Sequence, residues 1–144
     1  QETLIYRLPD HSKNCLHNTA LGKAYLASLP DDLLAETIDR LDFTIKTNKT
    51  IADKAALLKA LQKVRARQYA MAEEEYLSGL LAIGAALRHP VSGKGVGAVS
   101  FDFSVLQHTA AQIEEKYGNL ICETAGMLSR LLPPDHGHLH ADGR

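Results

Sequence analysis

Apolar residues recur at helical spacing in three stretches of the first half of the chain. They predict helices over residues 19–29, 30–41 and 53–68, because side chains three and four positions apart share one face of a helix. Asn18 or Thr19 can cap the first helix by accepting a hydrogen bond from a free backbone amide. Each helix has one apolar face, so each is expected to pack against a core.

Shorter apolar runs, rich in β-branched and aromatic residues, follow a different pattern. They predict strands over residues 3–8, 69–71, 80–87 and 96–103. The last two runs flank the turn-forming stretch 90–95, which favours an antiparallel hairpin. Both runs are so apolar that helices must cover at least one face of the sheet.

The last third of the chain carries its strongest helical pattern. One face of a single long helix is predicted to point inward, and two consecutive prolines end that helix. This face comprises Leu106, Ala110, Ile113, Tyr117, Leu120, Thr124, Met127 and Leu131. Mixed helices and antiparallel strands indicate an α+β domain over residues 1–132, followed by a flexible tail over residues 133–144.

Composition narrows the class of protein. The chain has 144 residues, of which 45% are hydrophobic and 23% charged, which suits one globular domain with its own core. Lys and Arg number 16 against 17 Asp and Glu. Because binding to duplex DNA relies on a surplus of cations facing the phosphates, the chain by itself is not expected to grip nucleic acid.

The cysteines and the first residues of the chain indicate the cellular compartment of the protein. Cys15 and Cys122 are too few for a disulfide framework and fit the reducing cytoplasm. No apolar run is long enough to cross a bilayer, and the first residues lack the pattern of a secretory signal. We therefore expect a cytoplasmic protein. Because the chain begins with Gln1 and not with Met, we also expect it to be part of a longer one.

Three segments, in this order, resemble the effector domain of IclR-type bacterial transcription regulators. The first is LHNTALGKAYLASLPDD at 16–32, which is similar to the helix opening LH-x-T-A-x-GKA-x-L-A of that family. The second is ADKAALLKALQKVRARQYAMAEEEYLSGLLAIGAAL at 52–87, where a helix ends, a short strand follows and a Glu precedes an apolar strand. The third runs from VGAVSFDFS to MLSRLLP. Together they cover roughly residues 16–132.

The resemblance implies a GAF/PAS-like fold, which is a curved antiparallel sheet with helices packed on its faces and a ligand pocket between them. It implies that the domain binds a small organic effector and that Ala20 and Leu21 contact the acid group of this effector. It implies no cofactor. It further implies a homodimer or tetramer that contacts operator DNA only through an N-terminal winged helix-turn-helix domain outside this chain. The effector domain itself is expected to be incomplete at its N-terminal side. The expected effector-binding residues are Ala20, Leu21, Gly22, Ala72, Leu80, Ala82, Ser100 and Asp102.

The residues themselves agree with an acid-binding site at the opening of the first helix. Backbone amides there have no helical acceptor, and the positive end of the helix dipole favours a carboxylate by about 0.3–1 kcal/mol at exposed sites. Gly22 permits close approach of backbone and ligand. Strand alternation puts Leu80 and Ala82 on one face together, and likewise Ser100 and Asp102, of which Ser100 can donate one hydrogen bond.

Departures from the family pattern alter the expected pocket. Gln68 stands where the family has Gly, Ala72 where it has Asp or Ser, and Ala82 where it has Cys, whereas Glu75 is retained. If the backbone at Gln68 is left-handed, glutamine ends its helix about 1 kcal/mol less favourably than glycine. The loss of two polar side chains predicts a roomier, more apolar cavity for an aromatic or longer organic acid. An ionised Asp102 would instead favour an amine or hydroxyl, so the effector class stays open.

Other candidate chemistries remain as alternatives. Glu73–Glu75 form an acidic run that we interpret as a solvated turn, although these residues or Asp102 could act in a GAF-like enzyme. No nucleophile, metalloprotease or phosphate-loop motif is present, which argues against catalysis. A ligand-free dimerisation scaffold is the third possibility. Six potential metal ligands are expected to bind no metal, and these are His11, Cys15, His17, His136, His138 and His140.

Overall fold

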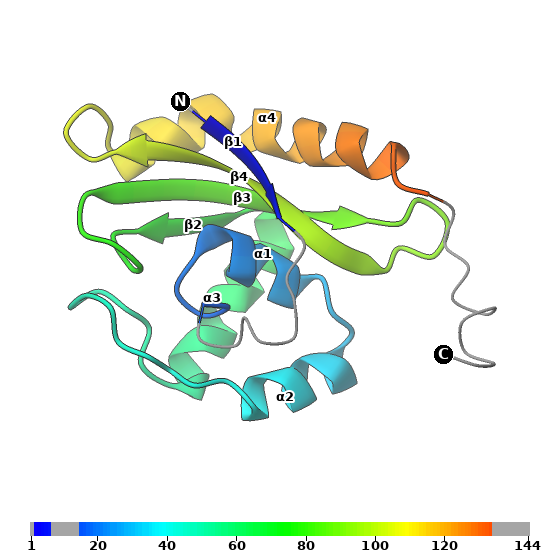
Figure 1. Ribbon diagram of the computed structural model, residues 1–144, viewed down its shortest axis with the longest axis horizontal. Coiled ribbons are helices and arrows are strands. Elements are labelled where there is room, and N and C mark those ends of the chain that lie inside the picture. Colours follow the sequence, from blue (N-terminus) through cyan, green and yellow to red (C-terminus); the bar gives the residue numbers. More distant parts are fainter. Residues whose placement is uncertain (1, 7–14, 134–144) are drawn as a thin grey trace.

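Four helices and a four-stranded antiparallel sheet make up the computed structural model, which describes residues 2–6 and 15–133. The strands lie in the order β1-β4-β3-β2 (Figure 1). In chain order the elements are β1 (Glu2–Tyr6), α1 (Ala20–Ala27), α2 (Asp31–Asp39), α3 (Lys54–Arg67), β2 (Ala70–Glu73), β3 (Leu80–Arg88), β4 (Gly95–Ser104) and α4 (Ala110–Arg130). The predicted α+β class and the hairpin of the last two strands are thus confirmed.

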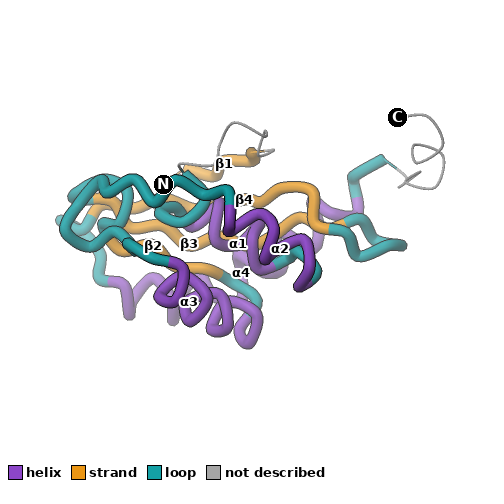
Figure 2. Tube along the Cα trace, turned by 90° about the horizontal axis from the view of Figure 1, so that it is seen from below, coloured by secondary structure: helices purple, strands orange, loops and turns teal. Residues whose placement is uncertain are grey.

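Helices cover both faces of the sheet, so the molecule has three layers. In Figure 1, α4 lies above the strands, whereas α1, α2 and α3 lie below them. Figure 2, which views the molecule from below, accordingly has α1 to α3 in the foreground. Successive side chains of a strand point to opposite faces of the sheet, so each strand contributes alternate residues to two separate cores. The core under α4 includes Leu81, Ile83, Val99, Phe101, Ile113 and Ile121, whereas the core around α1 to α3 includes Leu26, Ile38, Leu57, Leu61 and Ala98.

The start of α1 is fixed by its cap and by two close approaches. The Thr19 hydroxyl accepts a hydrogen bond from the Gly22 amide at 2.9 Å, so the second of the two predicted caps is the one used. A Cβ added at Gly22 would lie 2.5 Å from the Leu16 Cα, and one added at Gly84 would lie 3.1 Å from the Ala20 carbonyl oxygen. Gly84 therefore lets the first turn of α1 sit directly on β3, and Gly22 lets the segment before α1 pass close to that turn.

The end of α3 and the edge strand β2 are tied to α4 on the opposite layer. Arg67 Nη1 lies 3.0 Å from Glu114 Oε2, and the Tyr69 hydroxyl donates to the same oxygen at 2.8 Å. Burial, together with Glu114, raises the pKa of Tyr69. Gly118 leaves room for the Tyr69 ring, since a Cβ there would lie 3.2 Å from it. This contact joins the two helical layers around the edge of the sheet.

The inward face predicted for the last helix is confirmed at Ala110, Ile113 and Tyr117 and is wrong at the four exposed residues Leu106, Leu120, Met127 and Leu131. Leu106 precedes α4 and is 91% exposed, and Met127 is 57% exposed. The residues that pack on the sheet are four apart, namely Ile113, Tyr117, Ile121 and Ala125, of which Tyr117 is only partly buried. The expected stripe repeated about every 3.5 residues, so it diverged from the packed stripe along the helix. Large apolar side chains are consequently left on the outer surface of α4.

Candidate functional site

Seven of the eight residues predicted to bind an effector line one cavity of about 170 Å³. The exception is Gly22, which lies in the first turn of α1 and packs against Leu16. The cavity lies between the start of α1 and the ends of β2, β3 and β4 where the sheet meets the loop after β2. Its lining consists of Asn18, Thr19, Ala20, Leu21, Ala72, Glu75, Tyr76, Leu80, Ala82, Ser100 and Asp102.

Strand register brings the residues from the sheet together. Ala72 of β2 pairs with Ala82 of β3, and Ala82 pairs with Asp102 of β4, so the three form one row across the sheet. Ala20 joins Ala72 and Ala82 in a small buried cluster. The methyl side chains of these alanines are too short to fill the space between α1 and the sheet. The cavity is the space that these short side chains leave between α1 and the sheet.

The end of the cavity at α1 presents hydrogen-bond donors. The first hydrogen bond within the helix runs from the Lys23 amide to the Thr19 carbonyl oxygen at 3.0 Å, and the Thr19 hydroxyl binds the Gly22 amide. The amides of Ala20 and Leu21 precede that first bond, so neither has an acceptor within the helix. Both residues line the cavity. With the helix dipole, they form an end suited to an anionic group.

A buried ion pair supports the loop that closes the cavity. Lys23 Nζ lies 2.7 Å from Glu75 Oε1, and the Lys23 side chain is only 5% exposed. Burial lowers the pKa of Lys23, although the neighbouring Glu75 carboxylate opposes the change. Glu75 therefore does not belong to a solvated turn, and the expectation for Glu73–Glu75 holds only for Glu73, which is exposed.

Glu74, the middle residue of this run, holds the loop from its outer side. Its carboxylate accepts a hydrogen bond from the Gly79 amide at 2.9 Å and pairs with Lys49 at 3.1 Å. The Gly79 amide and then Lys49 lower the pKa of Glu74. Glu74 and Glu75 thus hold the loop, whereas Glu73 is exposed, and of the three only Glu75 lines the cavity, as Asp102 also does.

The end of the cavity at β4 presents a hydroxyl and a carboxylate. Ser100 is 2% exposed, and its Oγ donates to Asp102 Oδ1 at 3.2 Å. An ionised carboxylate only accepts hydrogen bonds, and it has about four lone-pair positions. Ser100 and Asp102 therefore place a hydroxyl and a carboxylate side by side on the wall of the cavity.

Four lining residues were not among the eight expected ones, namely Asn18, Thr19, Glu75 and Tyr76, and of these Tyr76 had not been singled out at all. It lies in the loop between β2 and β3, where neither helical nor strand periodicity applies. Lys46 Nζ lies 5.8 Å from the centre of its ring. The only local signal is its position directly after Glu75, whose ion pair with Lys23 fixes this part of the loop over the cavity.

The described part of the chain offers no metal site. No group of three or more His, Cys, Asp or Glu side chains suited to one ion occurs within residues 2–6 and 15–133. His17 is buried, with Nε2 3.0 Å from the Thr44 carbonyl oxygen and its ring edge-on to Phe43. His11, His136, His138 and His140 lie outside the described residues. Among the described residues, no helix is both long and apolar enough to cross a membrane.

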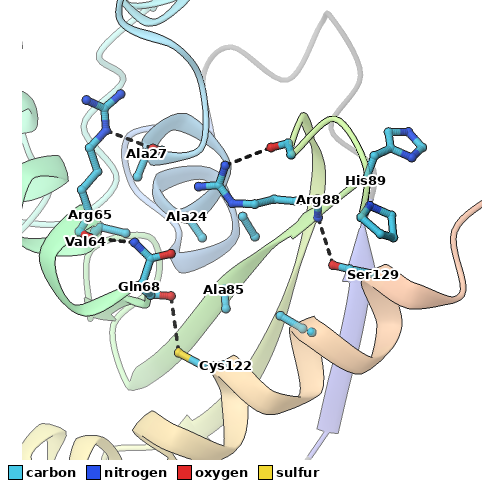
Figure 3. Close-up of a pocket in the computed structure, with 15 residues that line it drawn as sticks. Ala24, Ala27, Val64, Arg65, Gln68, Ala85, Arg88, His89, Cys122 and Ser129 are labelled. Atoms are coloured by element: carbon cyan, nitrogen blue, oxygen red, sulfur yellow. Dashed lines mark hydrogen bonds between the residues drawn. The ribbon is translucent and has the colours of Figure 1, made fainter. Parts of the chain in front are cut away.

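A second hollow, of about 350 Å³, lies between α1, the end of α3, β3 and α4 (Figure 3). Its most strongly charged groups already serve the fold. Arg65 Nε and Nη2 donate to the carbonyl oxygens of Ala27 and Leu29 at 3.0 and 2.7 Å, and Arg88 Nη1 donates to that of Ser28 at 3.3 Å. The two guanidinium groups approach α1 from opposite sides in Figure 3 and hold its C-terminal end. They thereby fix the helix whose other end lines the smaller cavity.

Comparison with known proteins places these features in a family. The sequence pattern of bacterial transcriptional regulator IclR C-terminal domains matches residues 5–130. The chain belongs to this family. The IclR C-terminal domain of Thermotoga maritima IclR superposes with a TM-score of 0.75 and 32% identity, covering 81% of this chain and 47% of the other. The predicted GAF/PAS-like architecture of the IclR effector domain is thereby confirmed.

Two further relatives of this IclR domain carry informative names. The HTH-type transcriptional repressor AllR of Klebsiella pneumoniae is 32% identical over 124 residues, which are 86% of this chain and 45% of AllR. The inducer-binding domain of the PobR transcription factor of Acinetobacter, a double mutant in complex with 3-hydroxybenzoic acid, superposes with a TM-score of 0.73 and 25% identity. That match covers 81% of this chain and 66% of the PobR chain. The chain spans between 34% and 47% of the length of the curated relatives that it matches.

Proposed function

We propose that this IclR effector domain binds a small organic acid in the cavity at the start of α1 and is not catalytic. Binding there changes the operator affinity of a DNA-binding domain that belongs to the same regulator in the cytoplasm. The observation that carries the proposal is the convergence of seven expected effector-binding residues, from four separate elements, on one cavity. We take the domain to comprise residues 1–132.

The size and lining of the cavity favour an acid of moderate size. Its volume of about 170 Å³ is close to that of an engineered apolar cavity of about 150 Å³ that binds benzene. Alanines and Leu80 provide an apolar wall, while the amides of Ala20 and Leu21 provide donors for a carboxylate. The aromatic acid bound by the PobR domain agrees with this chemistry. An aromatic or comparably sized monocarboxylic acid is therefore the proposed effector class.

The decisive test removes the cavity and leaves the sheet in place. In Ala82→Phe, the ring occupies the space between Ala20 and Ala72, so effector binding measured by calorimetry should be lost while the circular dichroism spectrum is kept. Ala111→Phe is the matched control, since Ala111 is exposed on α4. The effector itself is best found by native mass spectrometry of gently purified protein. Unchanged affinity in Ala82→Phe, or consumption of the acid by the purified wild type, would contradict the proposal.

We also propose that the regulator is a homodimer or tetramer and that this domain contributes to its assembly. The support is the row of large apolar residues left on the outer face of α4, where Leu120, Met127 and Leu131 are 43%, 57% and 79% exposed. Contiguous apolar patches of this kind mark interaction surfaces more often than free surfaces. Closed symmetric assemblies are the commonest outcome for a self-complementary patch.

A further inference from the structure

Tyr76 gives the cavity at the start of α1 an aromatic wall. Among the described residues that line this cavity, it alone carries an aromatic ring, whereas the apolar remainder of the lining is alanine and leucine. Tyr76 is 38% exposed, so it borders both the cavity and the solvent. The residue therefore stands at the mouth of the cavity, where its ring can contact a ligand bound inside.

The backbone that carries Tyr76 is held from two sides. The carboxylate of Glu75, the preceding residue, accepts a hydrogen bond from Lys23 Nζ of α1 at 2.7 Å, and both side chains are largely buried. The Thr50 hydroxyl, from the connection between α2 and α3, donates to the Glu75 carbonyl oxygen at 2.6 Å. Because these contacts belong to the fold, the place of Tyr76 is set before any ligand arrives.

A cation holds the ring of Tyr76 from outside the cavity. Lys46 Nζ lies over the ring, 5.8 Å from its centre, and an ammonium group is attracted to the face of an aromatic ring. The Lys46 amide donates to the Thr50 hydroxyl at 3.1 Å, which ties this cation to the same turn that holds Glu75. Lys46 does not belong to the described lining of the cavity, so it leaves the cavity side of the ring to a ligand.

We propose, on the basis of the proposed function, that Tyr76 determines specificity by making the cavity select an aromatic acid over a saturated acid with the same carbon skeleton. Two aromatic rings in edge-to-face or offset contact attract each other beyond the area that they bury, whereas a saturated ring gains burial alone. The alanine and leucine walls offer burial to both acids. The carboxylate of either acid meets the amides of Ala20 and Leu21, so the two ligands differ only at the ring.

Benzoate and cyclohexanecarboxylate test this selection by calorimetry, because each consists of one six-carbon ring and one carboxylate. Wild-type protein should bind benzoate about two- to tenfold more tightly. Tyr76→Leu, which keeps an apolar side chain but no ring, should remove most of this preference, whereas Tyr76→Phe should keep it. Leu77→Ala is the matched control in the same loop, since Leu77 is 57% exposed and is not part of the described lining, and it should change neither affinity.

A second measurement reports the contact itself. Nuclear Overhauser effects should connect the ring protons of bound benzoate with those of Tyr76, whose signals are identified by their absence in Tyr76→Leu. If Tyr76 acted only by supporting the loop, its substitution could change the affinity, but the wild type would show no such effects.

The outcomes separate this inference from the function on which it rests. The role of Tyr76 is overturned if wild-type protein binds both acids equally, prefers the saturated acid or keeps its preference in Tyr76→Leu, and loss of that binding in Ala82→Phe would then still support the proposed function. If neither acid binds, the inference on ligand class is overturned, and a small molecule co-purified with the protein decides the proposed function by itself. Should Tyr76→Leu fail to fold, Tyr76→Gln, which suits an exposed loop, takes its place in both measurements.

Discussion

Gln68 shows how one residue can be unfavourable in its place and still be tolerated. Its φ of 72° lies in the left-handed region at the C-cap of α3, where glycine is favoured. The side chain recovers part of the cost by donating from Nε2 to the Arg65 carbonyl oxygen at 2.7 Å. We expect Gln68→Gly to raise the free energy of unfolding by up to about 1 kcal/mol, measured by urea denaturation.

The control for that substitution is a residue that must still adopt the left-handed backbone conformation but has a different side chain. Gln68→Ala loses the hydrogen bond to Arg65 without gaining the freedom of glycine, so it should be less stable than wild type. If Gln68→Gly is no more stable than Gln68→Ala, the left-handed backbone is not what limits stability here.

Individual site residues were predictable where a regular element carries them. That Ser100 shares a face with Asp102, and Leu80 with Ala82, follows from strand alternation. The resemblance to the IclR family supplied which strand faces are expected to line the effector site. Tyr76 was not predictable, because it lies in an irregular loop whose path depends on the ion pair between Lys23 and Glu75. That ion pair joins residues 52 positions apart, so no local sequence pattern predicts it.

At the scale of elements, His17 fastens the long connection between α2 and α3 to the start of α1. Its ring is fully buried, Nε2 lies 3.0 Å from the Thr44 carbonyl oxygen, and Nδ1 has no hydrogen-bond partner among the described residues. Burial lowers the pKa of His17 below its usual value of 6.5, and Lys23 acts in the same direction. The hydrogen bond to Thr44 and the charges of Asp42 and Glu75 oppose that change without cancelling it.

A pH dependence of stability follows with a definite sign. Because the folded state prefers the neutral ring, the unfolded state takes up the proton first as the pH falls below 6.5. The contribution of His17 is therefore complete above that pH and is lost below it, until the pH passes the lowered pKa of the folded state. Urea midpoints measured from about pH 8 to about pH 5 should fall less steeply in His17→Gln than in wild type.

The half-exposed His108 provides the comparison, since its ring packs on Phe103 beside α4. His108→Gln should keep the steep acid dependence of the wild type. Equal slopes for His17→Gln and wild type would show that protonation of His17 does not weaken the fold.

The periodicity of apolar residues predicted which segments are helices and strands more reliably than it predicted which face of a helix is buried. The three helices before β2 lie within their predicted ranges, because caps such as Thr19 and Asp53 mark their starts. The packed face of α4 did not follow, since its buried residues include two small ones, Ala125 in the core against the sheet and Gly118 against the Tyr69 ring. Packing of this kind depends on the partner surface, which a one-dimensional pattern does not contain.

At the scale of the whole molecule, the misjudged face of α4 bears on assembly. Leu120, Thr124, Met127 and Leu131 are spaced four, three and four residues apart, which is the repeat of a helix-pairing seam. Leu120, Met127 and Leu131 remain exposed although the opposite face of α4 is fully used against the sheet. Such a stripe on two copies of the chain is self-complementary and can be buried by a two-fold interface.

Met127→Glu should therefore weaken self-association, because a carboxylate at the middle of the seam would be buried without a partner. Light scattering is expected to give a mass nearer to that of one chain than the wild type gives at the same concentration. Leu58→Glu is the matched control, since Leu58 is 39% exposed on α3, on the other side of the sheet, and should leave the mass unchanged. A wild type that is a single chain at every concentration, or an equal loss of mass in both variants, would remove α4 as the interface. In that case the exposed stripe would need another partner, and effector binding would have to reach the operator by a route that does not cross α4.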